Sequence, residues 1–201
     1  MFTSIKHFIT RYIKRITIPM LVVSVTFGIG ILVGLYITIY IPSVKEQIEH
    51  QLVTFSHDFE GLSRTQLAIA IFANNIQKAF TAISLGMLFG VVPVFFIFVN
   101  GVVLGVVGYL VVVKVGWTPV MAAVLPHGVV EIPAILLAGG VGLWLGVVVY
   151  KKLRKVLVVS FKKEIQDGLY FFVGVLVPLF FIAAIIEAFL TTALVDALFI
   201  L

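Results

Sequence analysis

Residues 66–113 form a long stretch in which Lys78 is the one charged side chain, and this stretch constrains the fold most strongly. As a single helix it would be roughly 72 Å long, more than twice a hydrocarbon core of about 30 Å. It must therefore turn and cross a bilayer twice. Across the chain 62% of residues are hydrophobic and 11% are charged, whereas soluble domains carry about 25% charged residues. A surface of that composition would aggregate in water, so the sequence predicts an integral membrane protein.

The turn within this stretch is predicted at Gly90-Val91-Val92-Pro93, because proline ends a helical hydrogen-bond ladder and glycine tolerates the turn. The fold class that follows is an all-α, polytopic transmembrane helical bundle with five spans and amphipathic interfacial helices. Its expected segments are 1–16 as a cytoplasmic amphipathic interfacial helix, 17–40 as span 1, 41–65 as a short outer loop, 66–149 as spans 2–4, 150–168 as a basic cytoplasmic linker, and 169–201 as span 5 and tail. Residues 17–40 are too long for a signal-peptide core, so we expect them to be a retained anchor.

The distribution of basic residues predicts the orientation in the cell membrane. Of the 14 Lys and Arg residues, four lie in 1–16 and six in 150–168, and five spans place both segments on the same side. Because Lys and Arg are enriched in cytoplasmic loops, we expect a cytoplasmic N-terminus. These basic segments also predict contact with anionic lipid in the bilayer. They are not interleaved with aromatic stacking residues, so no nucleic-acid partner is expected.

Glycines four residues apart recur in the apolar stretches: Gly30 and Gly34, Gly86 and Gly90, Gly101 and Gly105, Gly142 and Gly146. Small residues at this spacing let two helices approach closely in lipid. Two interpretations stay open, namely packing inside one bundle and a homodimer interface. Gly128 is a further expected packing position.

Several polar residues lie at membrane depth, where an ionisable group costs several kcal/mol unless it is paired or hydrated. When each span is centred in the bilayer, polar groups from four spans fall at similar depth, as one shared site requires. The candidates for this intramembrane polar or ion site are Asn74, Asn75, Asn100, His127, Glu131 and Glu187.

His127 and Glu131 are the most informative of these candidates, because residues four apart project from one helical face. We expect them to contact Asn100 inside the bundle, directly or through an ion or water. They are also the residues that would bind a metal, with Glu187 as a third ligand. No cofactor is predicted, and a bound cation stays an open alternative. The absence of cysteine excludes disulfides and thiolate metal sites.

Four strings around these residues resemble the stage II sporulation protein M family: IFANNIQ at 71–77, FVNG at 98–101 with Gly105 following, LPHGVVEIPAILLAG at 125–139, and AAIIEAFLTT at 183–192. The resemblance implies a multispanning helical protein. It also implies a role like that of a membrane anchor, which holds cell-wall-degrading partners during engulfment of the forespore. By motif, the positions carried over are Asn75, Asn100, Gly101, His127, Gly128, Glu131 and Glu187.

Three classes of function follow. The first expectation is a non-catalytic membrane scaffold for protein partners, with the Asn/His/Glu cluster as an internal lock. The alternative is an ion or small-solute channel or transporter that uses this cluster, since intramembrane acids and histidines mark ion pathways. An intramembrane metalloenzyme is the third class. It is disfavoured because catalytic zinc sites usually have more than one His, and His127 is the one His within the expected spans.

Overall fold

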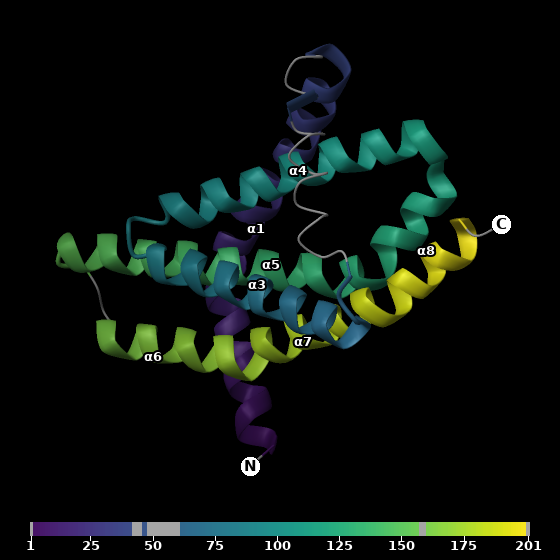
Figure 1. Ribbon diagram of the computed structural model, residues 1–201. Coiled ribbons are helices and arrows are strands. Elements are labelled where there is room, and N and C mark those ends of the chain that lie inside the picture. Colours follow the sequence, from purple (N-terminus) through teal and green to yellow (C-terminus); the bar gives the residue numbers. More distant parts are fainter. Residues whose placement is uncertain (1, 42–45, 48–60, 157–159, 200–201) are drawn as a thin grey trace.

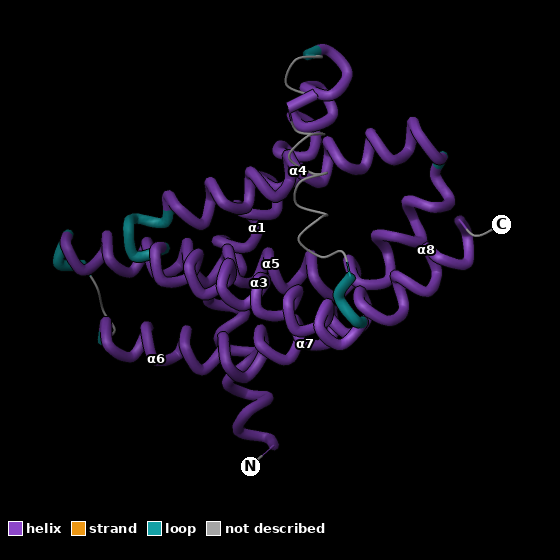
Figure 2. The backbone as a smooth tube through the Cα atoms, in the orientation of Figure 1, coloured by secondary structure: helices purple, strands orange, loops and turns teal. Residues whose placement is uncertain are grey.

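The chain folds into a bundle of helices, and its computed structural model describes residues 2–41, 46–47, 61–156 and 160–199. Most of the expected outer loop, 41–65, lies outside the described residues. Figure 2 shows helices joined by short turns and no strand in the described part of the chain. The all-α class is therefore confirmed.

The first helix, α1 (Phe2–Tyr40), is continuous and contains Pro19. The boundary expected at residue 17, between an interfacial helix and span 1, therefore lies inside one helix. Tyr12 and Ile16, on the expected interfacial segment, are buried in the core of the bundle. In Figure 1, α1 crosses the direction of the other long helices.

The next helices run back and forth along one direction: α3 (Arg64–Leu85), α4 (Val91–Val115) and α5 (Trp117–Leu153) (Figure 1). Helix α3 begins at a capping box, in which the Ser63 hydroxyl accepts from the Gln66 amide and the Gln66 side chain accepts from the Ser63 amide. The chain reverses between Leu85 and Val91, beside the predicted turn. Gly90 has φ +74° there, a conformation that glycine adopts at low cost.

The last helical segment runs from Phe161 to Phe199 as α6 (Phe161–Phe171), η1 (Phe172–Leu176), α7 (Val177–Ile185), η2 (Ile186–Thr191) and α8 (Thr192–Phe199). The segments η1 and η2 are π-helical, so the wider turn rotates the residues that follow relative to an α-helix. Such segments occur frequently at functional sites.

The basic segment 150–168, expected as a linker, is largely helical, because α5 continues to Leu153 and α6 begins at Phe161. Leu153 and Val156 are exposed, but Ile165 packs against the core. Leu157 lies outside the described residues. The inward face of α6 carries Glu164, which is 1% exposed and whose burial has an electrostatic cause described below.

Candidate functional site

A cavity of about 510 Å³ opens between α3, α4, α5 and the last helical segment. Its walls include all of the polar residues that the sequence predicts for one site: Asn74, Asn75, Asn100, His127, Glu131 and Glu187. The fold thus brings the polar groups of four helical segments to a single space. Lys78, the charged residue of the long apolar stretch, also lines the cavity.

Helix α5 contributes the ionisable pair at the centre of the cavity. His127 Nε2 and Glu131 Oε2 lie 3.9 Å apart on adjacent turns of the helix. That distance exceeds a hydrogen bond, so neither atom satisfies the other directly. Both atoms remain available to a third group.

Helix α3 holds Glu131 from the opposite wall. Asn75 is buried, and its Nδ2 donates a hydrogen bond of 3.0 Å to Glu131 Oε1. Lys78, one turn further along α3, lies close enough to Glu131 for an electrostatic interaction. The same face of α3 therefore offers the carboxylate both a hydrogen-bond donor and a positive charge.

The π-helical segment η2 contributes two residues, Glu187 and Thr191. Thr191 Oγ1 lies 3.3 Å from His127 Nδ1, and Thr191 is buried. Ligand-type atoms of His127, Glu131 and Glu187 all lie within 4.8 Å of one another. Thr191 was not predicted, because a threonine in an apolar helix carries no sequence signal for a site.

Asn100 lines the cavity but differs from its expected role. Its Nδ2 donates to the carbonyl oxygen of Phe96 at 2.8 Å, one turn earlier in α4. Asparagine side chains readily make such local bonds to their own backbone. The amide nitrogen is thereby held on α4, and among the described residues Asn100 makes no direct hydrogen bond to His127 or Glu131, so a contact through an ion or water in their shared cavity stays a prediction.

The sequence pattern of the stage II sporulation protein M family matches residues 23–192 of this chain. The chain belongs to this family. No curated protein and no solved structure matches it. The region that matches the stage II sporulation protein M family contains Thr191 and all six predicted cavity residues, whereas Tyr12 and Arg15 precede it.

Like its family, the protein is a membrane protein. Four described helices are long and apolar enough to cross a bilayer: Ile5–Tyr40, Val91–Val115, Trp117–Leu153 and Phe161–Ala197. Helix α3, which carries Asn74, Asn75 and Lys78, is not among them.

The glycine pairs of this family member lie against one another within the chain. A Cβ on Gly30 or Gly34 would meet the carbonyl oxygens of Phe98 and Val102 in α4, and one on Gly101 or Gly105 would meet those of Phe27 and Ile31 in α1. Gly86 and Gly90 lie similarly against Gly142 and Gly146. Gly128 is buried but makes ordinary contacts. Gly101 therefore clears room for α1.

A second polar cluster joins α1, α5 and α6. Arg15 Nη1 lies 3.0 Å from both carboxylate oxygens of Glu164 and 3.0 Å from Asp167 Oδ2. Trp144 Nε1 donates to Glu164 Oε2 at 2.9 Å. These donors explain how a carboxylate can be buried on α6. The sequence does not predict this cluster, because the basic pattern of 1–16 and of 150–168 is typical of two separate segments on the membrane surface.

Proposed function

We propose that this family member is a non-catalytic membrane transport protein that binds a cation in the cavity beside His127 and Glu131. The supporting observation is the cavity itself, a space of about 510 Å³ lined by two carboxylates, an imidazole and three amides. Because a polar cavity inside a membrane protein costs free energy, a tight cluster of paired side chains would be the more stable solution for a purely structural role. The chain keeps the space open.

The unused hydrogen-bonding capacity of the lining supports this proposal. Among the described residues, neither Glu187 nor Asn74 has a side-chain hydrogen-bond partner, although both line the cavity. Glu131 uses one oxygen for Asn75 and turns the other toward His127. A bound cation would satisfy these oxygens at once.

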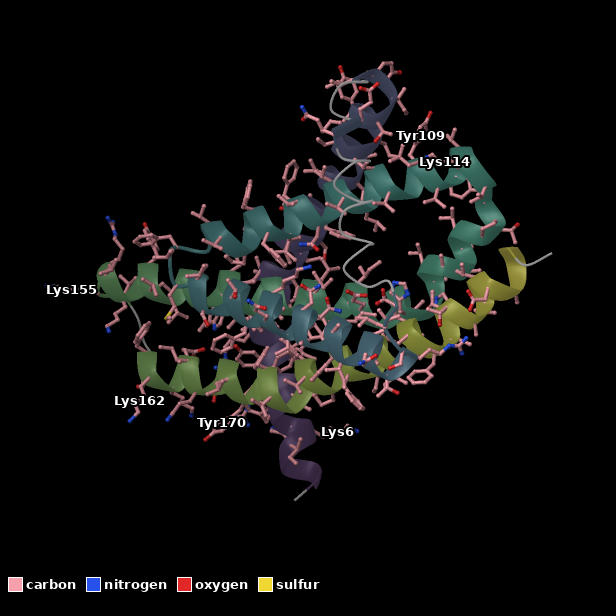
Figure 3. The ribbon with its side chains drawn as sticks, viewed as in Figure 1. Lys6, Tyr109, Lys114, Lys155, Lys162 and Tyr170 are labelled. Carbon is pink, nitrogen blue, oxygen red and sulfur yellow. The ribbon has the colours of Figure 1, made fainter. Side chains whose placement is uncertain are left out.

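We further propose that α3 is a fifth span and that the N-terminus is cytoplasmic. Helix α3 has 22 residues, which at about 1.5 Å per residue gives roughly 33 Å, enough for a hydrocarbon core of about 30 Å. It runs antiparallel to α4, as the alternation of spans requires (Figure 1). Figure 3 shows Lys155 and Lys162 at one end of the bundle and Lys114 at the other, as the predicted charge asymmetry requires, whereas Lys6 on α1 lies away from both ends.

The basic end of the bundle is also the proposed contact with anionic lipid. Its described basic side chains lie at the surface: Lys151, Lys152, Arg154, Lys155, Lys162 and Lys163. Each would gain about 1 kcal/mol near an anionic leaflet, and salt would screen that gain.

A scaffold for membrane-protein partners is the second candidate. Two hydrogen bonds favour it, because Asn75 to Glu131 joins α3 to α5, and His127 to Thr191 joins α5 to η2. In that case these bonds would act as a lock that holds the bundle in one arrangement. The scaffold predicts a stability change, and no loss of ion flux, when the lock is altered.

Cation flux into proteoliposomes separates the two candidates. Purified protein is reconstituted, and uptake of Na⁺, K⁺, Mg²⁺ and Zn²⁺ is measured for the wild type and for Glu131→Gln. We expect uptake of at least one cation by the wild type and a loss of roughly tenfold or more in the variant. Glu46→Gln, at an exposed position outside the bundle core, serves as the matched control and should transport normally. Uptake no faster than in protein-free vesicles for every cation would contradict the proposal.

A further inference from the structure

We propose that His127, Glu131 and Glu187 form a three-ligand site for a divalent transition-metal ion of the zinc type. This inference rests on the proposed cation-binding function and names the ion class. The three side chains come from α5 and η2, and their ligand-type atoms lie within 4.8 Å of one another. Two ligands of a tetrahedral zinc ion, each about 2.1 Å from the metal, are about 3.4 Å apart. The 3.9 Å between His127 Nε2 and Glu131 Oε2 is close to that value.

The contact with Thr191 accommodates the histidine tautomer that a metal needs, because the Thr191 hydroxyl can accept a proton from His127 Nδ1 as well as donate one to it. If His127 Nε2 carried the proton, it would face Glu131 Oε2 at 3.9 Å, too far for a hydrogen bond. If Nδ1 carries it, the proton is donated to Thr191 Oγ1 at 3.3 Å. In the second arrangement the Nε2 lone pair and the carboxylate oxygen face each other, and a cation between them would relieve their repulsion. Metal-ligating histidines typically donate their other N–H to such a neighbouring group.

Asn75 orients the carboxylate in the same way. Its Nδ2 binds Glu131 Oε1 at 3.0 Å, so the carboxylate is fixed with Oε2 on the side of His127 Nε2. Ligating carboxylates in proteins are commonly held by hydrogen bonds of this kind. Asn75 and Thr191 are therefore assigned as positioning residues for two of the three ligands.

The π-helical segment η2 places its two residues together. Glu187 lies among the ligand atoms and Thr191 lies against His127, so both point to the same side of the last helical segment. Segment η2 spans Ile186–Thr191 and contains both residues. A π-helical turn at a functional site is a recurrent feature of helices.

The donor set decides the class of metal. Imidazole nitrogen favours zinc, copper, iron and nickel, whereas magnesium and calcium prefer oxygen ligands throughout. Three protein ligands leave at least one position of a four-coordinate ion for water or another ligand, which suits an ion that must later leave.

The test is binding of Co²⁺ and Zn²⁺ to detergent-purified protein that carries no polyhistidine tag. His50 and His57, which lie outside the described residues, are replaced by Gln in the background. Co²⁺ reports its coordination by visible absorption, and Zn²⁺ is measured by competition with a chelator. We expect one ion per chain, a nitrogen-and-oxygen tetrahedral spectrum, and little competition from Mg²⁺ or Ca²⁺.

Variants assign the ligands. Glu187→Gln and His127→Gln should abolish stoichiometric binding, and Thr191→Val should weaken it by about tenfold to a hundredfold. His7→Gln, an exposed histidine of α1, is the matched control and should bind normally. Circular dichroism checks that each variant remains folded.

Different results would show that the transition-metal site is wrong and that the transport function is wrong. Flux of Na⁺, K⁺ or Mg²⁺ without stoichiometric Co²⁺ or Zn²⁺ binding would overturn the transition-metal site and leave the cation-binding function standing. Metal binding that survives both Glu187→Gln and His127→Gln would also overturn the site. Binding with the expected dependence, but no flux of any cation, would support the site and contradict transport.

Discussion

Glu131 is the side chain at which the polar contacts of the cavity meet. It accepts a hydrogen bond from Asn75, faces His127 and lies within electrostatic range of Lys78. The carboxylate therefore has one oxygen fixed by Asn75 and one oxygen that faces His127. If the site binds a cation, Lys78 competes with that cation for the same negative charge.

This competition leads to a prediction for Lys78→Met. The change removes a positive charge beside Glu131 and keeps the length of the side chain, so cation affinity should rise by roughly threefold or more. Metal titration of the purified variant measures the effect. Lys114→Met is the control, because Lys114 lies in the last turn of α4 and does not line the cavity. A weaker affinity in Lys78→Met would mean that Lys78 is part of the binding site and not a competitor.

The second polar cluster, formed by Arg15, Trp144, Glu164 and Asp167, gives another prediction. Glu164 is 1% exposed, and Arg15→Met would leave its charge buried with Trp144 as the remaining donor. Removing one partner of a buried ion pair costs about 3–5 kcal/mol, so the melting temperature in detergent should fall by several degrees or more. Arg11→Met, which replaces an exposed arginine one turn earlier, should melt like the wild type. Equal melting temperatures for the two variants would show that Arg15 does not stabilise Glu164.

At the scale of elements, glycine determines how closely the helices pack. Backbone of α1 lies directly on backbone of α4, because Gly30 and Gly34 face Gly101 and Gly105. In lipid, where helices gain little from burying apolar side chains, such close packing is a main source of association.

Two glycines of the same helix test this packing. In Gly34→Ala the new Cβ would meet the carbonyl oxygen of Val102, and rigid backbone cannot move aside as a side chain could. Helices α1 and α4 must then separate, at a cost of about 1–3 kcal/mol. In Gly28→Ala the Cβ has nothing within 4 Å, so this variant should be neutral or more stable, since alanine favours a helix by about 1 kcal/mol. Thermal unfolding of both proteins, in the same detergent, would contradict the account if Gly34→Ala were the more stable.

The two polar clusters differ in how far sequence could predict them. Asn74, Asn75, Asn100, His127, Glu131 and Glu187 stand out because each is a polar residue at membrane depth, and all of them line one cavity. Thr191 shares a helical face with Glu187, four residues earlier, but it does not stand out because threonine is common in apolar helices, where its hydroxyl can bond to its own backbone. Arg15 and Glu164 are 149 positions apart, and each resembles an ordinary surface charge beside the membrane.

For the molecule as a whole, hydropathy and charge were enough to predict an all-α membrane bundle. They did not predict where each helix begins and ends, because these positions depend on packing between helices. Helix α1 continues through residue 17 because Tyr12 and Ile16 are buried against the core. The hydropathy of residues 1–16 indicated a helix at the membrane interface. Hydropathy reports the average environment of a segment and does not show which other helices it packs against. Five spans remain a prediction, since α3 combines a spanning length with several polar residues.

Cysteine accessibility tests whether α5 crosses the membrane and in which direction. The chain has no native cysteine, so Lys155→Cys and Lys114→Cys can each be labelled as single sites in intact cells. We expect an impermeant reagent to label position 114 from outside and position 155 only after the membrane is opened. Labelling of position 155 from outside would exclude the proposed orientation. Labelling of both positions from one side would mean that α5 does not cross the membrane.

The central claim is that the cavity beside Glu131 is a cation-binding site and not a structural lock. The most direct measurement is the melting temperature of the wild type and of Glu131→Gln, each with and without Na⁺, K⁺, Mg²⁺ or Zn²⁺. Glutamine keeps an acceptor for Asn75, so the packing contact survives while the charge is lost.

At a hundredfold excess over the dissociation constant, a bound ion stabilises the fold by about 2.7 kcal/mol, which raises the melting temperature by roughly 5–10 °C. The account predicts this rise for the wild type, no rise for Glu131→Gln, and similar melting temperatures for the two proteins without metal. A wild type whose melting temperature responds to none of Na⁺, K⁺, Mg²⁺ and Zn²⁺, together with a Glu131→Gln variant that melts several degrees lower, would contradict cation binding and identify the cluster as a lock.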